Sequence, residues 1–81
     1  MKGKKIFITG GAGYLGKSLV RKYHKDNQIT VYSRDEAKHY YLKKEFPSVT
    51  CIIGDIRNFD LLNRSCKGHD IGIFAASLKQ I

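Results

Sequence analysis

The chain has 81 residues, of which 42% are hydrophobic and 27% are charged, and its formal net charge is +8. This length allows one small domain, and the composition is that of a globular chain with no apolar run near the roughly 20 residues that cross a bilayer. The basic residues are spread along the chain without interleaved stacking aromatics, which argues against a nucleic-acid surface.

Apolar residues follow two kinds of spacing. Four short runs rich in β-branched and aromatic residues predict strands, at residues 5–9, 29–32, 49–53 and 70–75. The segments between them have helical periodicity, and we expect helices from Tyr14 to about Lys25, from near Ser33 to before Pro47, and from Asn58 or Asp60 to Gly68. Ser33 and Glu36 have the spacing of a capping box, which predicts Ser33 as the start of the second helix.

This alternation predicts an α/β fold. Strands that alternate with helices of about a dozen residues form a parallel sheet with right-handed crossovers. The order β-α-β-α-β-α-β is that of the N-terminal half of a Rossmann-type doubly wound sheet, with strand order 3-2-1-4. We therefore expect residues 1–81 to form the N-terminal portion of one such domain. Ile71, Ile73 and Phe74 would then form an exposed apolar edge. We therefore expect a longer protein, or a second copy or partner chain that completes the sheet.

A glycine-rich loop, TGGAGYLG at residues 9–16, joins the first strand to the first helix. Gly10 permits the tight turn, Gly13 lets the backbone approach a pyrophosphate, and Gly16 lets the helix pack closely on the strand. The pyrophosphate is expected at the helix N-terminus, where free N–H groups favour an anion. The loop therefore predicts dinucleotide binding.

The same loop also fits a second pattern. Counted from Gly11, the run GAGYLGKS matches the phosphate loop of NTPases, GxxxxGK[ST]. That alternative predicts that Lys17 reaches the phosphates and that an acidic strand end downstream holds magnesium. The residues at the ends of the other strands fit a nicotinamide cofactor better.

The end of the second strand distinguishes NAD from NADP. Enzymes that use NAD carry Asp or Glu there, to bind the ribose 2′-hydroxyl. This chain has Ser33 and Arg34, and an arginine offers a planar fork to a 2′-phosphate, although Asp35 could still reach the ribose. NADP is thus favoured over NAD. At the next strand end, Asp55 could accept from the adenine amino group, or simply cap a turn.

Together these residues resemble the extended short-chain dehydrogenase/reductase superfamily of NAD(P)-dependent epimerases and dehydratases, whose loop has the form TGxxGxxG. More narrowly, YSRDE at 32–36, GDIRN at 54–58 and AASLK at 75–79 are similar to the nucleotide-sugar dehydratases of polysaccharide biosynthesis, above all the UDP-N-acetylglucosamine 4,6-dehydratases. The chain departs from that pattern at Asn58, where Asp is usual, and at Ser77 and Gln80, where Ala and His are usual.

The resemblance implies three groups of cofactor-binding residues. They are Gly10, Gly13, Tyr14, Leu15 and Gly16 at the pyrophosphate; Ser33, Arg34 and Lys38 at the 2′-phosphate; and Asp55 and Ile56 at adenine with Ala75, Ala76 and Lys79 beside the ribose and nicotinamide. It implies that the family's catalytic Ser/Thr, its YxxxK pair and its UDP-sugar pocket lie beyond the fourth strand. We therefore expect no catalytic residue in this chain.

The resulting hypothesis is the NADP-binding portion of a nucleotide-sugar dehydratase or epimerase. The alternative is a non-catalytic NAD(P)-binding module, or a truncated remnant of such an enzyme. Cys51 and Cys66 fit neither a CxxC redox motif nor a zinc site, so we expect reduced thiols, no metal and a cytoplasmic protein.

Overall fold

Seven elements alternate along the chain in a computed structural model that describes residues 2–10 and 14–74. The strands are β1 (Lys5–Thr9), β2 (Gln28–Ser33), β3 (Thr50–Ile53) and β4 (Ile71–Phe74). The helices are α1 (Tyr14–Tyr23), α2 (Glu36–Glu45) and α3 (Phe59–Cys66). The predicted order of strands and helices is confirmed.

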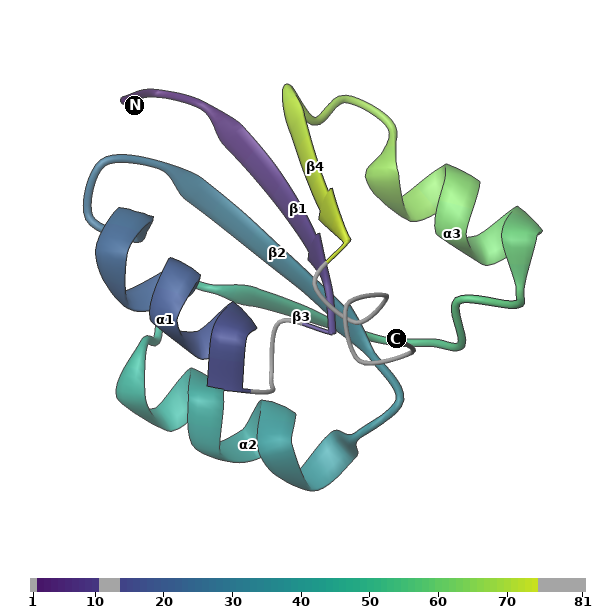
Figure 1. Cartoon of the computed structure of the whole chain (residues 1–81), viewed down its shortest axis with the longest axis horizontal. Helices are drawn as coiled ribbons and strands as arrows, with labels where there is room; N and C mark the ends of the chain where they lie inside the picture. The colour runs from purple at the N-terminus through teal and green to yellow at the C-terminus, as the bar shows by residue number, and fades with distance from the viewer. Residues whose placement is uncertain (1, 11–13, 75–81) are drawn as a thin grey trace.

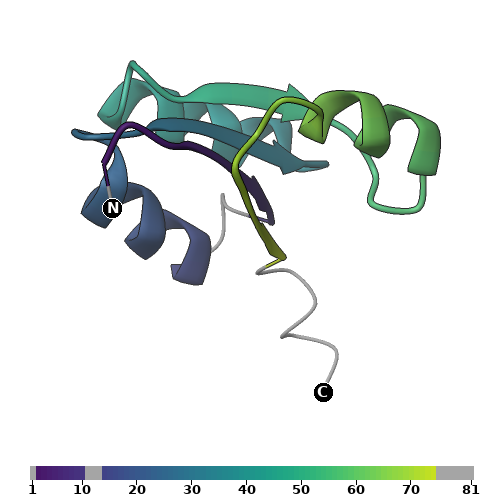
Figure 2. The same cartoon turned by 90° about the horizontal axis from the view of Figure 1, so that it is seen from above.

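The four strands form one parallel sheet in the order β3-β2-β1-β4, as predicted. Ile8 in β1 pairs with Val31 on one side and with Ile73 on the other, so β1 is central and β4 lies at an edge. Helices α1 and α2 lie on one side of the sheet and α3 lies on the other (Figures 1 and 2). Right-handed crossovers produce this arrangement. The connections from β1 to β2 and from β2 to β3 run in one direction across the sheet, whereas the connection from β3 to β4 runs back past β1. Its helix, α3, therefore lies on the opposite face.

The core lies between the sheet and helices α1 and α2. Alternate strand residues face this side, α1 adds its apolar stripe, and α2 adds Leu42. The buried cluster consists of Ile6, Ile8, Val20, Ile29, Val31, Leu42, Phe46 and Val49. Because adjacent strand positions face opposite sides, two neighbouring strands contribute alternate apolar residues to one continuous core.

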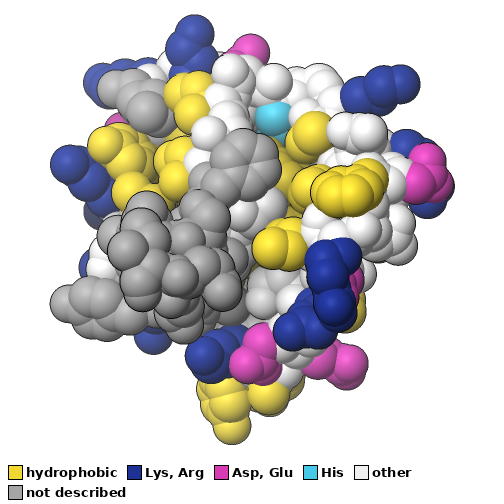
Figure 3. Space-filling view, turned by 45° about the vertical axis from the view of Figure 1, so that its right-hand side comes forward, with side chains coloured by type: hydrophobic (Ala, Val, Ile, Leu, Met, Phe, Trp, Pro, Cys, Tyr) yellow, Lys and Arg dark blue, Asp and Glu magenta, His cyan; other side chains and the backbone are white. Residues whose placement is uncertain are grey.

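The other face of the sheet is covered more thinly. Phe7 and Tyr32 bury their rings there, 5.8 Å apart, and the His69 ring meets Phe7 edge-on at 5.2 Å. Helix α3 has no fully buried residue, and Phe59 is 72% exposed. Hydrophobic side chains accordingly reach the surface among charged ones when the α3 side is turned forward (Figure 3).

The edge strand β4 is less exposed than the sequence predicted. Ile71 and Ile73 are half-buried, and both pack against the core cluster. At the start of the strand, the Asp70 carboxylate accepts a hydrogen bond from the Lys5 backbone N–H at 2.8 Å. β4 is therefore anchored to β1 by a side-chain hydrogen bond as well as by the backbone pairing of the sheet. The side chain of Phe74 lies outside the described residues.

Two predicted helix boundaries were wrong. Helix α1 ends at Tyr23 instead of Lys25, because the Asn27 side-chain amide donates to the Tyr23 carbonyl at 3.0 Å and so satisfies the helix end. Helix α2 is capped by Asp35, whose carboxylate accepts from the Lys38 N–H at 3.0 Å. Ser33 instead ends β2, and its hydroxyl accepts from the Asp35 N–H.

The boundaries of α3 agree with the prediction. Asn58 is the N-cap, with its side-chain oxygen accepting from the Leu61 N–H at 3.2 Å. Gly68 follows the C-cap and has φ of +82°, a conformation that favours glycine.

Candidate functional site

The carboxyl ends of all four strands lie at one edge of the sheet, because the strands are parallel. In open α/β sheets, ligands bind outside this edge where the strand order reverses. Here the order reverses at β1: the next strand in the chain, β2, lies on one side of β1, and β4 lies on the other side. Gly10, the first glycine of the loop, follows β1 directly at this edge.

Gly10 begins the turn out of β1. Its φ is +69°, and its N–H donates to the Tyr32 carbonyl at 2.9 Å, which ties the loop to the end of β2. Helix α1 begins at Tyr14, its first turn contains no acidic residue, and Gly16 is buried. The backbone of Tyr14 and Leu15 thus lies in the first helical turn. A helix start without acidic residues is suited to an anion.

A second group of predicted residues surrounds the start of α2. Ser33 ends β2 and is half-buried, whereas Arg34 and Lys38 are exposed. The Lys38 ammonium lies 3.9 Å from a carboxylate oxygen of Asp35. The other oxygen of the Asp35 carboxylate accepts from the Lys38 N–H at 3.0 Å and so caps α2.

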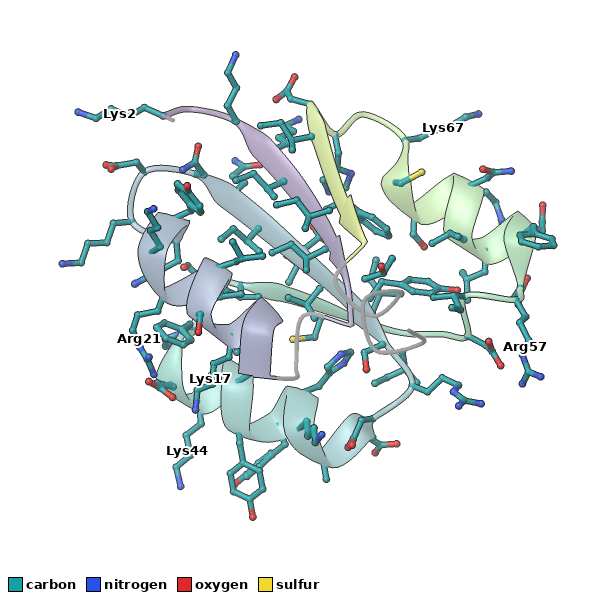
Figure 4. The ribbon with its side chains drawn as sticks, viewed as in Figure 1. Lys2, Lys17, Arg21, Lys44, Arg57 and Lys67 are labelled. Atoms are coloured by element: carbon teal, nitrogen blue, oxygen red, sulfur yellow. The ribbon has the colours of Figure 1, made fainter. Side chains whose placement is uncertain are left out.

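Asp55, just beyond β3, is the centre of a charged cluster with Arg34 and Arg57. The Arg57 backbone N–H and its Nε–H donate to Asp55 Oδ1 at 2.9 and 3.2 Å, and Arg57 Nη2 donates to Oδ2 at 2.8 Å. Arg34 Nη1 donates to Oδ2 at 3.4 Å. Arg57 lies in the loop between β3 and α3 (Figure 4). The cluster joins the ends of β2 and β3.

These donors change the acidity of Asp55. The hydrogen bonds from the Arg57 side chain, followed by that from its backbone N–H, lower the pKa of Asp55 from its usual value near 3.9 to about 2. The carboxylate is therefore ionised throughout the neutral range. It presents a negative charge at the edge where the cofactor is expected, offset by two arginines.

We expect the carboxyl group of Asp55 to titrate near pH 2, and Arg57→Gln to move that midpoint upward toward the usual value. A carboxyl with a lowered folded-state pKa stabilises the fold above its unfolded pKa. That stability is lost as the pH falls from about 4 toward 2. Carboxyl ¹³C shifts followed by NMR measure the midpoint, and urea unfolding at pH 5 and pH 2.5 measures the loss. A wild-type midpoint near 4 would contradict the geometry.

Tyr32 and Gly54 hold this cluster in place. The Tyr32 hydroxyl donates to the Asp55 carbonyl at 2.8 Å, and burial raises the pKa of Tyr32. The Gly54 N–H donates to the Ser33 carbonyl at 3.1 Å. A Cβ on Gly54 would lie 2.5 Å from the Tyr32 ring, so the close approach requires glycine.

The structure argues against the NTPase interpretation of the loop. Lys17 points from α1 to α2, where its ammonium lies 2.9 Å from a carboxylate oxygen of Glu45 (Figure 4). Arg21 approaches the other oxygen of Glu45 at 3.5 Å. Hydrogen bonds from Lys17, the largest cause, lower the pKa of Glu45. Lys17 therefore links two helices instead of facing the strand ends.

The structure brings together part of the predicted site. Arg34 and Asp55 are in contact, and Ser33 and Gly54 are joined through their backbones. Ile56 follows Asp55 and is 47% exposed. Four predicted residues lie outside the described part of the chain: Gly13, Ala75, Ala76 and Lys79.

Two residues of the site were missed at the sequence level. Arg57 was part of the GDIRN run, but only Asp55 and Ile56 were singled out there. A basic residue two positions after a turn aspartate was the available signal, because such spacing lets the backbone N–H and side chain of one residue reach the same carboxylate. Tyr32 gave no signal beyond its place in a strand.

Within residues 2–10 and 14–74, no group of three His, Cys, Asp or Glu side chains could hold a metal ion. In that same part of the chain, no helix has the length and apolar character needed to span a membrane.

A sequence model of the family described as "Polysaccharide biosynthesis protein" matches residues 6–81. The chain belongs to this family. The family resemblance inferred from the sequence motifs is therefore confirmed. The Rossmann-type fold predicted from the sequence is confirmed by the parallel sheet with its order β3-β2-β1-β4.

Several of its relatives are named as nucleotide-sugar epimerases or dehydratases. The chain is 36% identical over 83 residues to the UDP-N-acetylglucosamine 4,6-dehydratase (inverting) of Campylobacter jejuni, and 34% identical over 86 residues to the UDP-glucose 4-epimerase of Rickettsia massiliae; each match covers 96% of this chain and 25% of the relative. A solved UDP-N-acetylglucosamine 4-epimerase from Methanobrevibacter ruminantium, in complex with UDP-N-acetylmuramic acid, superposes with a TM-score of 0.76 at 25% identity, covering 91% of this chain and 24% of that one. The chain thus spans about a quarter of the length of these relatives.

Proposed function

We propose that this chain is the NADP-binding portion of a nucleotide-sugar 4,6-dehydratase or epimerase of the cytoplasm. The observation that carries the proposal is Arg34, an exposed cation at the end of β2, where enzymes that use NAD carry a carboxylate. The guanidinium fork matches the oxygens of a 2′-phosphate. Family membership supports the same cofactor class.

The described residues fit a dinucleotide. Gly10 turns the chain sharply after β1, and the first turn of α1 brings no negative charge. We assign the backbone of Gly10, Gly13, Tyr14, Leu15 and Gly16 to the pyrophosphate. We assign Ser33, Arg34 and Lys38 to the 2′-phosphate, Asp55 and Ile56 to adenine, and Ala75, Ala76 and Lys79 to the ribose and nicotinamide.

A bound nicotinamide supplies a hydride acceptor and donor for the oxidation and reduction of a sugar. The chain's own residues hold and orient it. The N–H groups at the start of α1 stabilise the two phosphates, and the turn at Gly10 leads the chain sharply out of β1 toward that helix start. In the family that this sequence resembles, a YxxxK pair takes the sugar proton. Tyr40 and Lys44 have that spacing, but both are exposed on α2.

Calorimetric titration of the protein with NADPH and NADH tests the proposal. We expect NADPH to bind at least about tenfold more tightly, because one charge-assisted contact to the extra phosphate is worth roughly 1.5–3 kcal/mol. Equal affinities would contradict NADP specificity, and no binding of either would contradict cofactor binding. Incubation with NADP and UDP-N-acetylglucosamine separates the roles: we expect no product from this chain alone.

A further inference from the structure

Two arginines hold the Asp55 carboxylate, but with unequal strength. Arg57 reaches both carboxylate oxygens: Nε lies 3.2 Å from each, Nη2 lies 2.8 Å from Oδ2, and the backbone N–H adds a bond of 2.9 Å to Oδ1. Arg34 contributes one contact of 3.4 Å. Forked, charge-assisted pairs are much the stronger kind. The Asp55 carboxylate therefore receives most of its hydrogen bonds from Arg57. Breaking its single contact with Arg34 should cost little free energy.

The surroundings allow this release. The side chains of Arg34 and Arg57 are 70% and 79% exposed, whereas that of Asp55 is 29% exposed. The Tyr32 hydroxyl holds the Asp55 backbone in place by donating a hydrogen bond to the Asp55 carbonyl. The carboxylate thus stays in place while the guanidinium of Arg34 is able to turn outward toward a ligand.

Resting on the proposed function, we propose that Arg57 is a positioning residue for cofactor specificity: by neutralising Asp55, it frees Arg34 to bind the 2′-phosphate of NADP. Without Arg57, the carboxylate would hold Arg34 for itself. It would also face the phosphate as an unbalanced like charge. Both effects oppose NADPH, and neither acts on NADH, which has no 2′-phosphate.

The test compares Arg57→Gln with the wild type by titration with NADPH and NADH. We expect the ratio of the two dissociation constants to shift about fivefold against NADPH, as one exposed charge pair at a few ångströms permits in water. The same substitution in the Asp55→Asn background tests whether Arg57 acts through the Asp55 carboxylate. There the carboxylate charge is gone, so Arg57→Gln should leave the ratio unchanged. The adenine contact of residue 55 cancels in the ratio.

Arg64→Gln is the matched control. Arg64 is an exposed arginine paired with an acidic residue, Asp60 at 3.3 Å, but it lies on α3 instead of at the strand ends. We expect it to leave the ratio unchanged. Unfolding in urea verifies that all variants are folded.

The outcomes separate this inference from the proposed function. A wild-type protein without preference for NADPH would overturn the proposed function. A wild type that prefers NADPH, with the same preference in Arg57→Gln, would overturn the role of Arg57 alone. An equal loss in the Asp55→Asn background would mean that Arg57 contacts the phosphate directly, and would also overturn the positioning role.

Discussion

Arg34→Asp should weaken NADPH binding about 100-fold and reverse the preference in favour of NADH. The variant loses a guanidinium contact to the 2′-phosphate and adds a charge that repels it, and the two effects together are worth roughly 3 kcal/mol. An aspartate at the end of β2 also accepts hydrogen bonds from ribose hydroxyls, as in NAD-dependent enzymes. Calorimetry with NADPH and NADH measures both changes.

Two controls accompany this variant. Arg34→Gln removes the charge without adding a new one, so we expect a loss of NADPH affinity of about tenfold and little change for NADH. Lys38→Gln removes a cation of the same region that already lies 3.9 Å from Asp35, and its effect should be smaller. If Arg34→Asp and wild type bound NADPH equally, the assignment of the 2′-phosphate to Arg34 would be wrong.

The strands and their order were predictable because their cause is local and repetitive. Short β-branched runs that alternate with helical periodicity leave few topologies, and right-handed crossovers select one of them. The same holds for Gly10 and Asn58, where a turn or a helix start restricts the residue types. In each case, the residues that form the structure are neighbours in the sequence.

The helix start at α2 shows where such reasoning fails. Ser33 and Asp35 are both good caps, and only the point at which β2 ends decides between them. The pairing of Ser33 with Ile53 extends β2 through Ser33, which leaves Asp35 to cap the helix. A contact between strands 20 residues apart thus determined a local boundary.

The contact between Arg34 and Asp55 was unpredictable for the same reason. Asp55 and Arg34 are 21 residues apart, and they meet only because β2 and β3 are neighbours in the sheet. The Tyr32 hydroxyl finds the Asp55 carbonyl in the same way. Sequence motifs singled out the residues at these strand ends, whereas the hydrogen bonds among them required the fold.

Gly54→Ala tests how tightly the end of β3 is built. The new Cβ would lie 2.5 Å from Cζ and from the hydroxyl oxygen of Tyr32, and the ring is fully buried and unable to move aside freely. Overpacking of this kind costs about 1–3 kcal/mol. In a domain of this size it lowers the melting temperature by roughly 5–20 °C. Thermal unfolding followed by circular dichroism measures it.

Two comparisons show whether the collision with Tyr32 is the cause. In a Tyr32→Leu background the ring is absent, so Gly54→Ala should cost much less than in the wild type, since contacting residues are strongly non-additive. Gly68→Ala is a contrast, because its new Cβ meets nothing within 4 Å and only the φ of +82° is strained. We expect this variant to lose about 1 kcal/mol of stability in both backgrounds. If Gly54→Ala cost the same with and without the Tyr32 ring, the backbone of residue 54 would be responsible. The close packing that positions Asp55 would then not depend on Tyr32.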